Sequence, residues 1–275
     1  MIIWISSYPK SGNTWVRSML SAFFYTDDGI FDFKLLDNIK QFPQDFEFIS
    51  QSLTNSTSLG DMANLWINAQ QRINEDGKLK FLKTHGVLNL PGHHFTDKAN
   101  SLAGIYVVRD PRSVITSLSN HFDLSTEASF EFLTNELNII NINNENSGLT
   151  YIGDWKNNYI SWRYCDFIKV KIVRYEDLLS STYKEFIGIL NFLNAFTEIA
   201  FNKTKIDNII KSTEFSRMQS NEQRLGFPEA QIRSGRKKAF FHLGKDNKWE
   251  RYVGKEISEK ICSKYLPEMK ELRYL

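Results

Sequence analysis

The feature that most constrains the fold is an apolar run, a turn and an amphipathic run near the N-terminus. Ile2–Ile5 is apolar and rich in β-branched residues, which is typical of a buried strand. Thr14–Phe24 carries apolar residues at helical spacing. The segment between them, Ser-Ser-Tyr-Pro-Lys-Ser-Gly-Asn at residues 6–13, contains the proline and glycine of a tight turn. We therefore expect a strand, a loop and a helix.

Such a loop is suited to binding phosphate. The free backbone N–H groups at a helix N-terminus, together with the helix dipole, favour an anion. Gly12 allows the backbone to approach a ligand closely, and Lys10 brings a mobile positive charge. Short polar side chains follow at Ser11, Asn13 and Thr14. We interpret the segment as a nucleotide phosphate loop; an ordinary turn with a solvated lysine is the alternative.

Further apolar runs and helical patterns alternate along the chain. The runs that indicate strands are Lys80–Lys83, Gly104–Val108 and Val170–Val173. The helical patterns are Asp61–Ile73, Pro111–Phe122, Phe130–Ile142, Tyr183–Leu193, Ile206–Ser212 and Gly254–Tyr265. Because these strands do not alternate apolar and polar residues, they favour a parallel sheet covered on both faces. We predict an α/β three-layer sandwich with a central parallel sheet, in a single domain over residues 1–275, with Gln219–Ala239 as a mobile loop.

Composition narrows the class of protein. Apolar residues make up 41% of the 275-residue chain, as in an ordinary globular protein. The net charge of +2 argues against a nucleic-acid partner. The two cysteines, Cys165 and Cys262, have no metal-ligand spacing, and no apolar stretch approaches the roughly 20 residues that cross a bilayer. We expect a cytoplasmic protein with no transmembrane segment; the sequence predicts nothing about oligomeric state.

The loop differs from the ATP-type phosphate loop. That pattern needs a glycine, four residues and then Gly-Lys-Ser/Thr, whereas here Lys10 precedes Gly12. A kinase using ATP and Mg²⁺ also needs a carboxylate metal ligand after a second buried strand. The run at Gly104–Val108 is followed first by an arginine, Arg109. This combination favours a second phosphate over a metal ion.

These residues resemble the sulfotransferases that use 3′-phosphoadenosine 5′-phosphosulfate (PAPS). Their first signature is Tyr-Pro-Lys-Ser-Gly-Thr-Thr-Trp, and residues 8–15 match it except at Asn13. The resemblance implies that Lys10 stabilises the departing phosphate. It also implies that the following residues hold the 5′-phosphosulfate together with Lys10: Ser11, Gly12, Asn13, Thr14 and Trp15.

Two further signatures follow in order. Tyr106-Val-Val-Arg109 with Ser117 eight residues later is similar to the pair that grips the 3′-phosphate in the family. Lys83-Thr-His85 is similar to the segment that carries the catalytic histidine, with Lys83 beside it. From the residues alone, Arg109 could instead form a surface ion pair and His85 could be structural. His93, His94 and His121 have no such context, and we expect them to be surface or helix residues.

Weaker similarities lie in the C-terminal half. Tyr175, Thr213 and Phe215 stand where the family contacts adenine. The last family signature, Arg-Lys-Gly-x-x-Gly-Asp-Trp, is changed here, because His242-Leu243 replaces Arg-Lys and Asn247 replaces the second glycine, while Gly244 is kept. The resemblance implies that His242 and Gly244 close over the cofactor. Residues 233–236, Arg-Ser-Gly-Arg, are a rival phosphate-binding segment.

The resemblance implies direct in-line transfer of a sulfonate group from PAPS, without a metal, to a hydroxyl or amine that His85 deprotonates. Aromatic segments at Phe23–Phe48 and Asp123–Phe132, and the loop after His85, are candidates for the acceptor pocket. They allow a small-molecule, lipid or saccharide acceptor. Two other functions stay open: a small-molecule kinase using ATP and Mg²⁺, and a non-catalytic nucleotide-binding protein.

Overall fold

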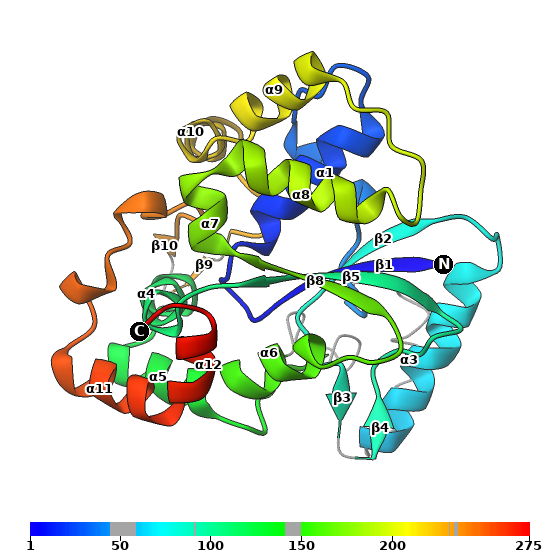
Figure 1. Cartoon of the computed structure of the whole chain (residues 1–275). Helices are drawn as coiled ribbons and strands as arrows, with labels where there is room; N and C mark the ends of the chain where they lie inside the picture. Colours follow the sequence, from blue (N-terminus) through cyan, green and yellow to red (C-terminus); the bar gives the residue numbers. More distant parts are fainter. Residues whose placement is uncertain (45–58, 91, 141–149, 231, 234–235) are drawn as a thin grey trace.

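The centre of the molecule is a sheet of four parallel strands in the order β2-β1-β5-β8 (Figure 1). The computed structural model describes residues 1–44, 59–90, 92–140, 150–230, 232–233 and 236–275. The strands are β1 (Ile2–Ser7), β2 (Lys80–Thr84), β5 (Ser101–Val108) and β8 (Lys169–Arg174). Each of the four predicted strands is confirmed, with its ends extended by one to three residues.

Helices cover both faces of the sheet, which confirms the three-layer sandwich. Ile3 and Ile5 of β1 pack with α1 (Asn13–Tyr25), α8 (Thr182–Leu193) and α9 (Lys203–Ser212). Ile2 and Trp4 point to the other face and pack with α3 (Leu59–Asn74), α4 (Pro111–Phe122) and α6 (Trp155–Arg163). Figure 1 shows α1, α8 and α9 above the sheet and α3 and α6 below it. Both faces of β1 are buried, and this explains why its sequence is apolar without alternation.

Shorter elements connect these layers. They are η1 (Phe33–Asn38), β3 (Asn89–Leu90), β4 (His93–His94), α5 (Thr126–Thr134), β6 (Ile139–Ile140), β7 (Thr150–Tyr151), α7 (Tyr175–Ser180), α10 (Phe215–Leu225), β9 (Ile232–Arg233), β10 (Arg236–Lys237), η3 (Gly244–Asp246), η4 (Trp249–Arg251), α11 (Lys255–Lys264) and α12 (Leu266–Glu271). The helix predicted at Gly254–Tyr265 is confirmed as α11. None of the helices in the described part of the chain combines the length and apolar character needed to cross a membrane.

Two predictions were wrong, one about the bounds of a helix and one about a loop. The helix expected at Phe130–Ile142 is α5, which starts earlier because the side chain of Ser125 accepts a hydrogen bond from the N–H of Ala128. It stops at Thr134, where the Asn138 side chain binds the carbonyl of Phe132; residues 141 and 142 lie outside the described part. The expected loop at Gln219–Ala239 begins as helix, since α10 continues to Leu225.

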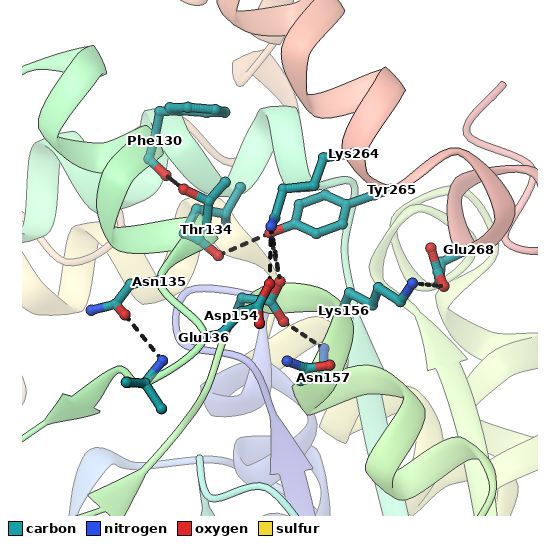
Figure 2. Close-up of polar contacts among 12 residues, drawn as sticks. Phe130, Thr134, Asn135, Glu136, Asp154, Lys156, Asn157, Lys264, Tyr265 and Glu268 are labelled. Atoms are coloured by element: carbon teal, nitrogen blue, oxygen red, sulfur yellow. Dashed lines mark hydrogen bonds and ion pairs between the residues drawn. The ribbon is translucent and has the colours of Figure 1, made fainter.

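A buried carboxylate, that of Asp154, connects several helices, and Figure 2 shows its polar contacts. Asp154 caps α6 by accepting a hydrogen bond from the N–H of Asn157 at 2.7 Å, and the hydroxyl of Tyr265 lies 3.2 Å from the same carboxylate. Burial raises the pKa of Asp154. The hydroxyl of Tyr8, in the phosphate loop, donates to the carbonyl of Phe132 at the end of α5. This cluster therefore joins α5, α6 and α11 under the loop that follows β1.

Candidate active site

The strands of the sheet deliver their functional residues to one cavity at their carboxyl ends. The cavity has a volume of about 630 Å³. Open α/β sheets bind ligands at this edge, because loops after neighbouring parallel strands meet there. All the predicted site residues except Ser11 line the cavity: Lys10, Gly12, Asn13, Thr14, Trp15, Lys83, His85, Arg109, Ser117, Tyr175, Thr213, Phe215, His242 and Gly244.

The loop between β1 and α1 has the geometry of an anion cradle. Gly12 has a left-handed backbone with φ of 102°, and a Cβ added there would lie 2.5 Å from the ring of Tyr175. Only glycine therefore fits. The amide of Asn13 donates to the carbonyl of Ile5 at 3.0 Å, so this side chain pins the loop to β1. Ser11 is fully buried, and its hydroxyl has no hydrogen-bond partner among the described residues.

His85 follows β2 and is held in one tautomer. Its Nδ1 lies 2.8 Å from the carbonyl oxygen of Ser7 and 3.3 Å from the Ser7 hydroxyl. A carbonyl only accepts, so Nδ1 carries the proton and Nε2 keeps its lone pair. Burial, with a contribution from the charge of Lys83, lowers the pKa of His85 to about 3. The imidazole is neutral at physiological pH, as a base requires.

Lys10 projects from the loop into the same cavity. Its Nζ lies 3.8 Å above the ring centroid of Phe240, which comes from the segment before η3. Burial lowers the pKa of Lys10 to about 7, and the neighbouring cations Lys83 and Arg109 act in the same direction. An anionic ligand would reverse this shift, because it favours the charged ammonium.

A second cationic position lies at the end of β5. The Nη1 of Arg109 lies 3.2 Å from the hydroxyl of Ser117 on α4 and 3.3 Å from the carbonyl of Lys10. The guanidinium stacks on the ring of Tyr175 at 4.2 Å. Its buried Nε has no hydrogen-bond partner among the described residues. The expected spacing of Arg109 and Ser117 thus produces a donor pair facing the cavity, and the alternative of a surface ion pair is not what the structure contains.

Aromatic and glycine residues form the far end of the cavity. Trp15 and Tyr175 meet edge to face with ring centroids 5.9 Å apart. Gly244 has φ of 53°, and a Cβ there would lie 2.7 Å from the ring of Phe215. The hydroxyl of Thr213 donates to the helical carbonyl of Ile209, so this side chain is used within α9 rather than toward the cavity.

A family model described as a sulfotransferase domain matches residues 2–273. The chain belongs to the sulfotransferase domain family. The luciferin sulfotransferase of Photinus pyralis is 25% identical over 229 residues, which are 79% of this chain and 56% of that protein. Sulfotransferase 1E1 of Cavia porcellus is 22% identical and covers 97% of this chain and 82% of its own length. The structure of mouse sulfotransferase SULT7A1 complexed with PAP superimposes with a TM-score of 0.60 at 19% identity, over 98% of this chain and 84% of that one.

The segment that contains His242, Gly244 and Asn247 differs from the last family signature in sequence. Asn247 donates its amide to the hydroxyl of Ser117 at 3.1 Å and to the carbonyl of Ser113 at 3.0 Å. His242 lines the cavity, and burial lowers its pKa, with a contribution from Lys238. In the rival segment at residues 233–236, Ser234 and Gly235 lie outside the described residues, and only the backbone of the two arginines is described.

Among the further residues that line the cavity, and that the sequence did not select as a site, are Arg17, His121, Glu229 and Asn247. His121 was expected to be a surface or helix residue; it lies on α4, one turn after Ser117, and helical spacing could have identified it. Arg17 lies one turn after Asn13 on α1. Glu229 pairs with groups far away in the sequence, and no local pattern indicates it.

The lining residues that could contact an acceptor differ in part from the segments predicted from the sequence. Phe33, Leu36, Asp37, Gln41 and Gln44 come from the predicted range Phe23–Phe48, of which residues 45–48 lie outside the described part. Phe122, Ile139 and Ile140 line the cavity in place of Asp123–Phe132. Phe23, on α1, packs in the core instead. The aromatic content of this range is therefore shared between the core and the cavity.

Proposed function

We propose that this protein transfers the sulfonate group of PAPS to a hydroxyl or amine of a small-molecule acceptor, within one domain spanning residues 1–275. The observation that carries the proposal is the pair of anion-binding positions on one cavity. The loop before α1 supplies the first, and Arg109 with Ser117 supplies the second. A nucleotide with phosphates on both its 5′ and 3′ positions needs two such positions, whereas ATP needs only the first.

The residues fit this cofactor. The Nε of Arg109 and the indole N–H of Trp15, on two residues that line the cavity, are buried without partners in the described part of the chain. Buried donors of this kind are expensive unless a ligand pairs with them. Arg109 and Ser117 would hold the 3′-phosphate, with Asn247 orienting the hydroxyl of Ser117, and the loop of Lys10–Trp15 would hold the 5′-phosphosulfate. The rings of Tyr175 and Phe215 would enclose the adenine.

The cofactor, when bound, supplies the sulfonate group for transfer. Nε2 of His85 would accept the proton of the acceptor, because Nδ1 is already committed to Ser7. The ammonium groups of Lys10 and Lys83 would stabilise the negative charge that develops during transfer. The positive charge that stabilises the transfer comes from these side chains and from the N-terminus of α1.

The acceptor is a small molecule with an apolar body. Support comes from Phe33, Phe122 and Ile140, which line the cavity, and from the similarity to a luciferin sulfotransferase. Lipids and saccharides are the other acceptors that such walls could receive. We also propose a cytoplasmic location.

The test is transfer of radiolabelled sulfonate from PAPS to a panel of phenols, amines, lipids and saccharides. The proposal predicts labelled product with at least one phenolic, other hydroxyl or amine acceptor. Transfer of a phosphate from ATP in place of sulfonate would support the kinase, which family membership disfavours. PAP binding without transfer to any acceptor would support a nucleotide-binding protein without catalysis.

A further inference from the structure

A glutamate from the segment after α10 binds the cationic groups of the cavity. One carboxylate oxygen of Glu229 lies 2.5 Å from Nη1 of Arg17 and 3.2 Å from Nζ of Lys83. The other oxygen accepts a hydrogen bond from the hydroxyl of Thr14 at 3.1 Å. The carboxylate thus connects the first two turns of α1 to the end of β2.

The cationic partners of Glu229 are buried, so they depend on its negative charge for stabilisation. The side chains of Lys83 and Arg17 are 5% and 6% exposed, and that of Glu229 is 25% exposed. A buried cation needs a paired anion, because water no longer stabilises it. Lys10 and Arg109 add two more cations to the same cavity. Among the described residues, Glu229 is the acid that forms ion pairs with Arg17 and Lys83.

Arg17 anchors the carboxylate of Glu229, and the carboxylate in turn orients Lys83. Arg17 is itself fixed, because its Nη2 donates to the carbonyl of Leu36 at 2.7 Å. Arg17 and Thr14 hold the carboxylate in place from α1, and the carboxylate in turn holds the ammonium of Lys83. Lys83 lies two residues before His85 on the same strand end, so both face the cavity.

We propose that Glu229 is a positioning residue for sulfonate transfer, which holds the ammonium of Lys83 charged and directed into the cavity. This inference rests on the proposed function. In the transfer, the acceptor oxygen bonds to sulfur and its proton goes to Nε2 of His85. The bond from sulfur to the bridging oxygen breaks, and its electron pair stays on the departing phosphate. Lys83 stabilises that charge only while it is an ammonium in the correct place.

The carboxylate could instead compete with the cofactor, since it binds the hydroxyl of Thr14 in the phosphate loop. The two roles differ in their effect on 3′-phosphoadenosine 5′-phosphate (PAP), the cofactor without its sulfonate. A competitor would weaken PAP binding in the parent protein. A positioning residue would leave PAP binding nearly unchanged and affect the rate of transfer.

The experiment compares Glu229→Gln, Glu229→Asp and the surface control Glu198→Gln. PAP binding is measured by calorimetry, and kcat and KM are measured with labelled PAPS and the best acceptor. We expect Glu229→Gln to bind PAP within about threefold of the parent while kcat falls about 100-fold, the loss typical of misplaced catalytic groups. Glu229→Asp, which keeps the charge, recovers part of kcat, and Glu198→Gln behaves as the parent.

Four results would overturn the proposal. Tighter PAP binding by Glu229→Gln with unchanged kcat means that the carboxylate competes with the cofactor. Loss of PAP binding in both Glu229 variants, with lowered melting temperatures, means that the residue serves the fold alone. A parent that transfers sulfonate while Glu229→Gln keeps full kcat refutes the positioning role but leaves the proposed function intact. A parent that binds PAP and transfers nothing refutes the proposed function itself, and the role of Glu229 with it.

Discussion

Nδ1 of His85 lies 2.8 Å from the carbonyl oxygen of Ser7, the last residue of β1. The parallel pairing of β1 and β2 sets this distance, since Ser6 is in register with Thr84. The carbonyl of His85 is fixed as well, because the amide of Asn158 donates to it at 2.9 Å. The sheet therefore determines which imidazole nitrogen is free to accept a proton.

Replacing His85 with alanine should lower kcat about 10²- to 10⁴-fold, the usual contribution of a general base. PAP binding should stay within a few-fold of the parent, because no contact to the phosphate-binding groups is lost.

The pKa of His85 is lowered to about 3 by burial, so the imidazole is neutral above that pH. Measured for the parent from pH 5 to pH 7, kcat/KM should show no protonation step at 6.5. A step there would mean that the base is another group or that His85 is solvated.

The affinity for PAP should fall as the pH rises above 7. Burial lowers the pKa of Lys10 to about 7 in the free protein, and bound phosphate raises it again. The bound state therefore holds one more proton above pH 7, and the dissociation constant should rise by up to about tenfold per pH unit. Calorimetry in buffers of different ionisation enthalpy measures the proton uptake. Lys10→Arg stays charged, so it should remove this dependence; an unchanged slope in that variant would contradict the assignment.

Asn247 should contribute to binding of the 3′-phosphate. Its amide donates to the hydroxyl of Ser117 beside Arg109. A lost hydrogen bond of about 1 kcal/mol predicts that Asn247→Ala binds PAP about fivefold more weakly. The affinity for 5′-AMP, which has no 3′-phosphate, is the control and should not change. Equal losses for both nucleotides would place the effect of Asn247 elsewhere in the cavity.

The Asp154 cluster should govern stability rather than catalysis. Asp154→Ala removes the cap of α6 and the partner of the Tyr265 hydroxyl, and should cost about 1–3 kcal/mol of unfolding free energy. Burial raises the pKa of this carboxyl, so its charge at pH 7 opposes folding. Asp154→Asn keeps a cap without that charge, and should be at least as stable as the parent at pH 7. Its advantage should shrink as the pH falls and the native carboxyl becomes protonated. Urea unfolding at pH 7 and pH 5 measures both effects; a loss of stability in Asp154→Asn would contradict this account.

The sequence predicts the central sheet well because buried parallel strands are apolar on both faces. It also predicts the phosphate loop and Arg109, since each lies directly after one of those strands. The helix α6 was not predicted: its buried side chains (Trp155, Asn158, Tyr159 and Trp162) stand at helical spacing, but they mix polar and aromatic residues instead of forming an apolar stripe. The end of α5 was misplaced because the side chain that binds its last turn, Asn138, lies in the segment after the helix.

The charges of the site could be predicted only in part. The pair of Glu229 and Arg17 joins residues 212 positions apart, so only the tertiary fold brings them together. The same holds for Asn247 and Ser117, which are separated by 130 positions. The change of Arg-Lys to His242-Leu243 is visible in the sequence. That Asn247, which replaces the second glycine of the signature, donates to Ser117 required the structure.

The most direct test of the central claim is calorimetric titration with PAP and with Mg·ATP, in the parent and in Arg109→Ala. The parent should bind PAP as a 1:1 complex and more tightly than Mg·ATP. Arg109→Ala should bind PAP about 10- to 100-fold more weakly, since charged hydrogen bonds contribute roughly 1.5–3 kcal/mol. Binding of Mg·ATP alone, with no binding of PAP, would contradict the assignment of this cavity to a cofactor with two phosphate positions.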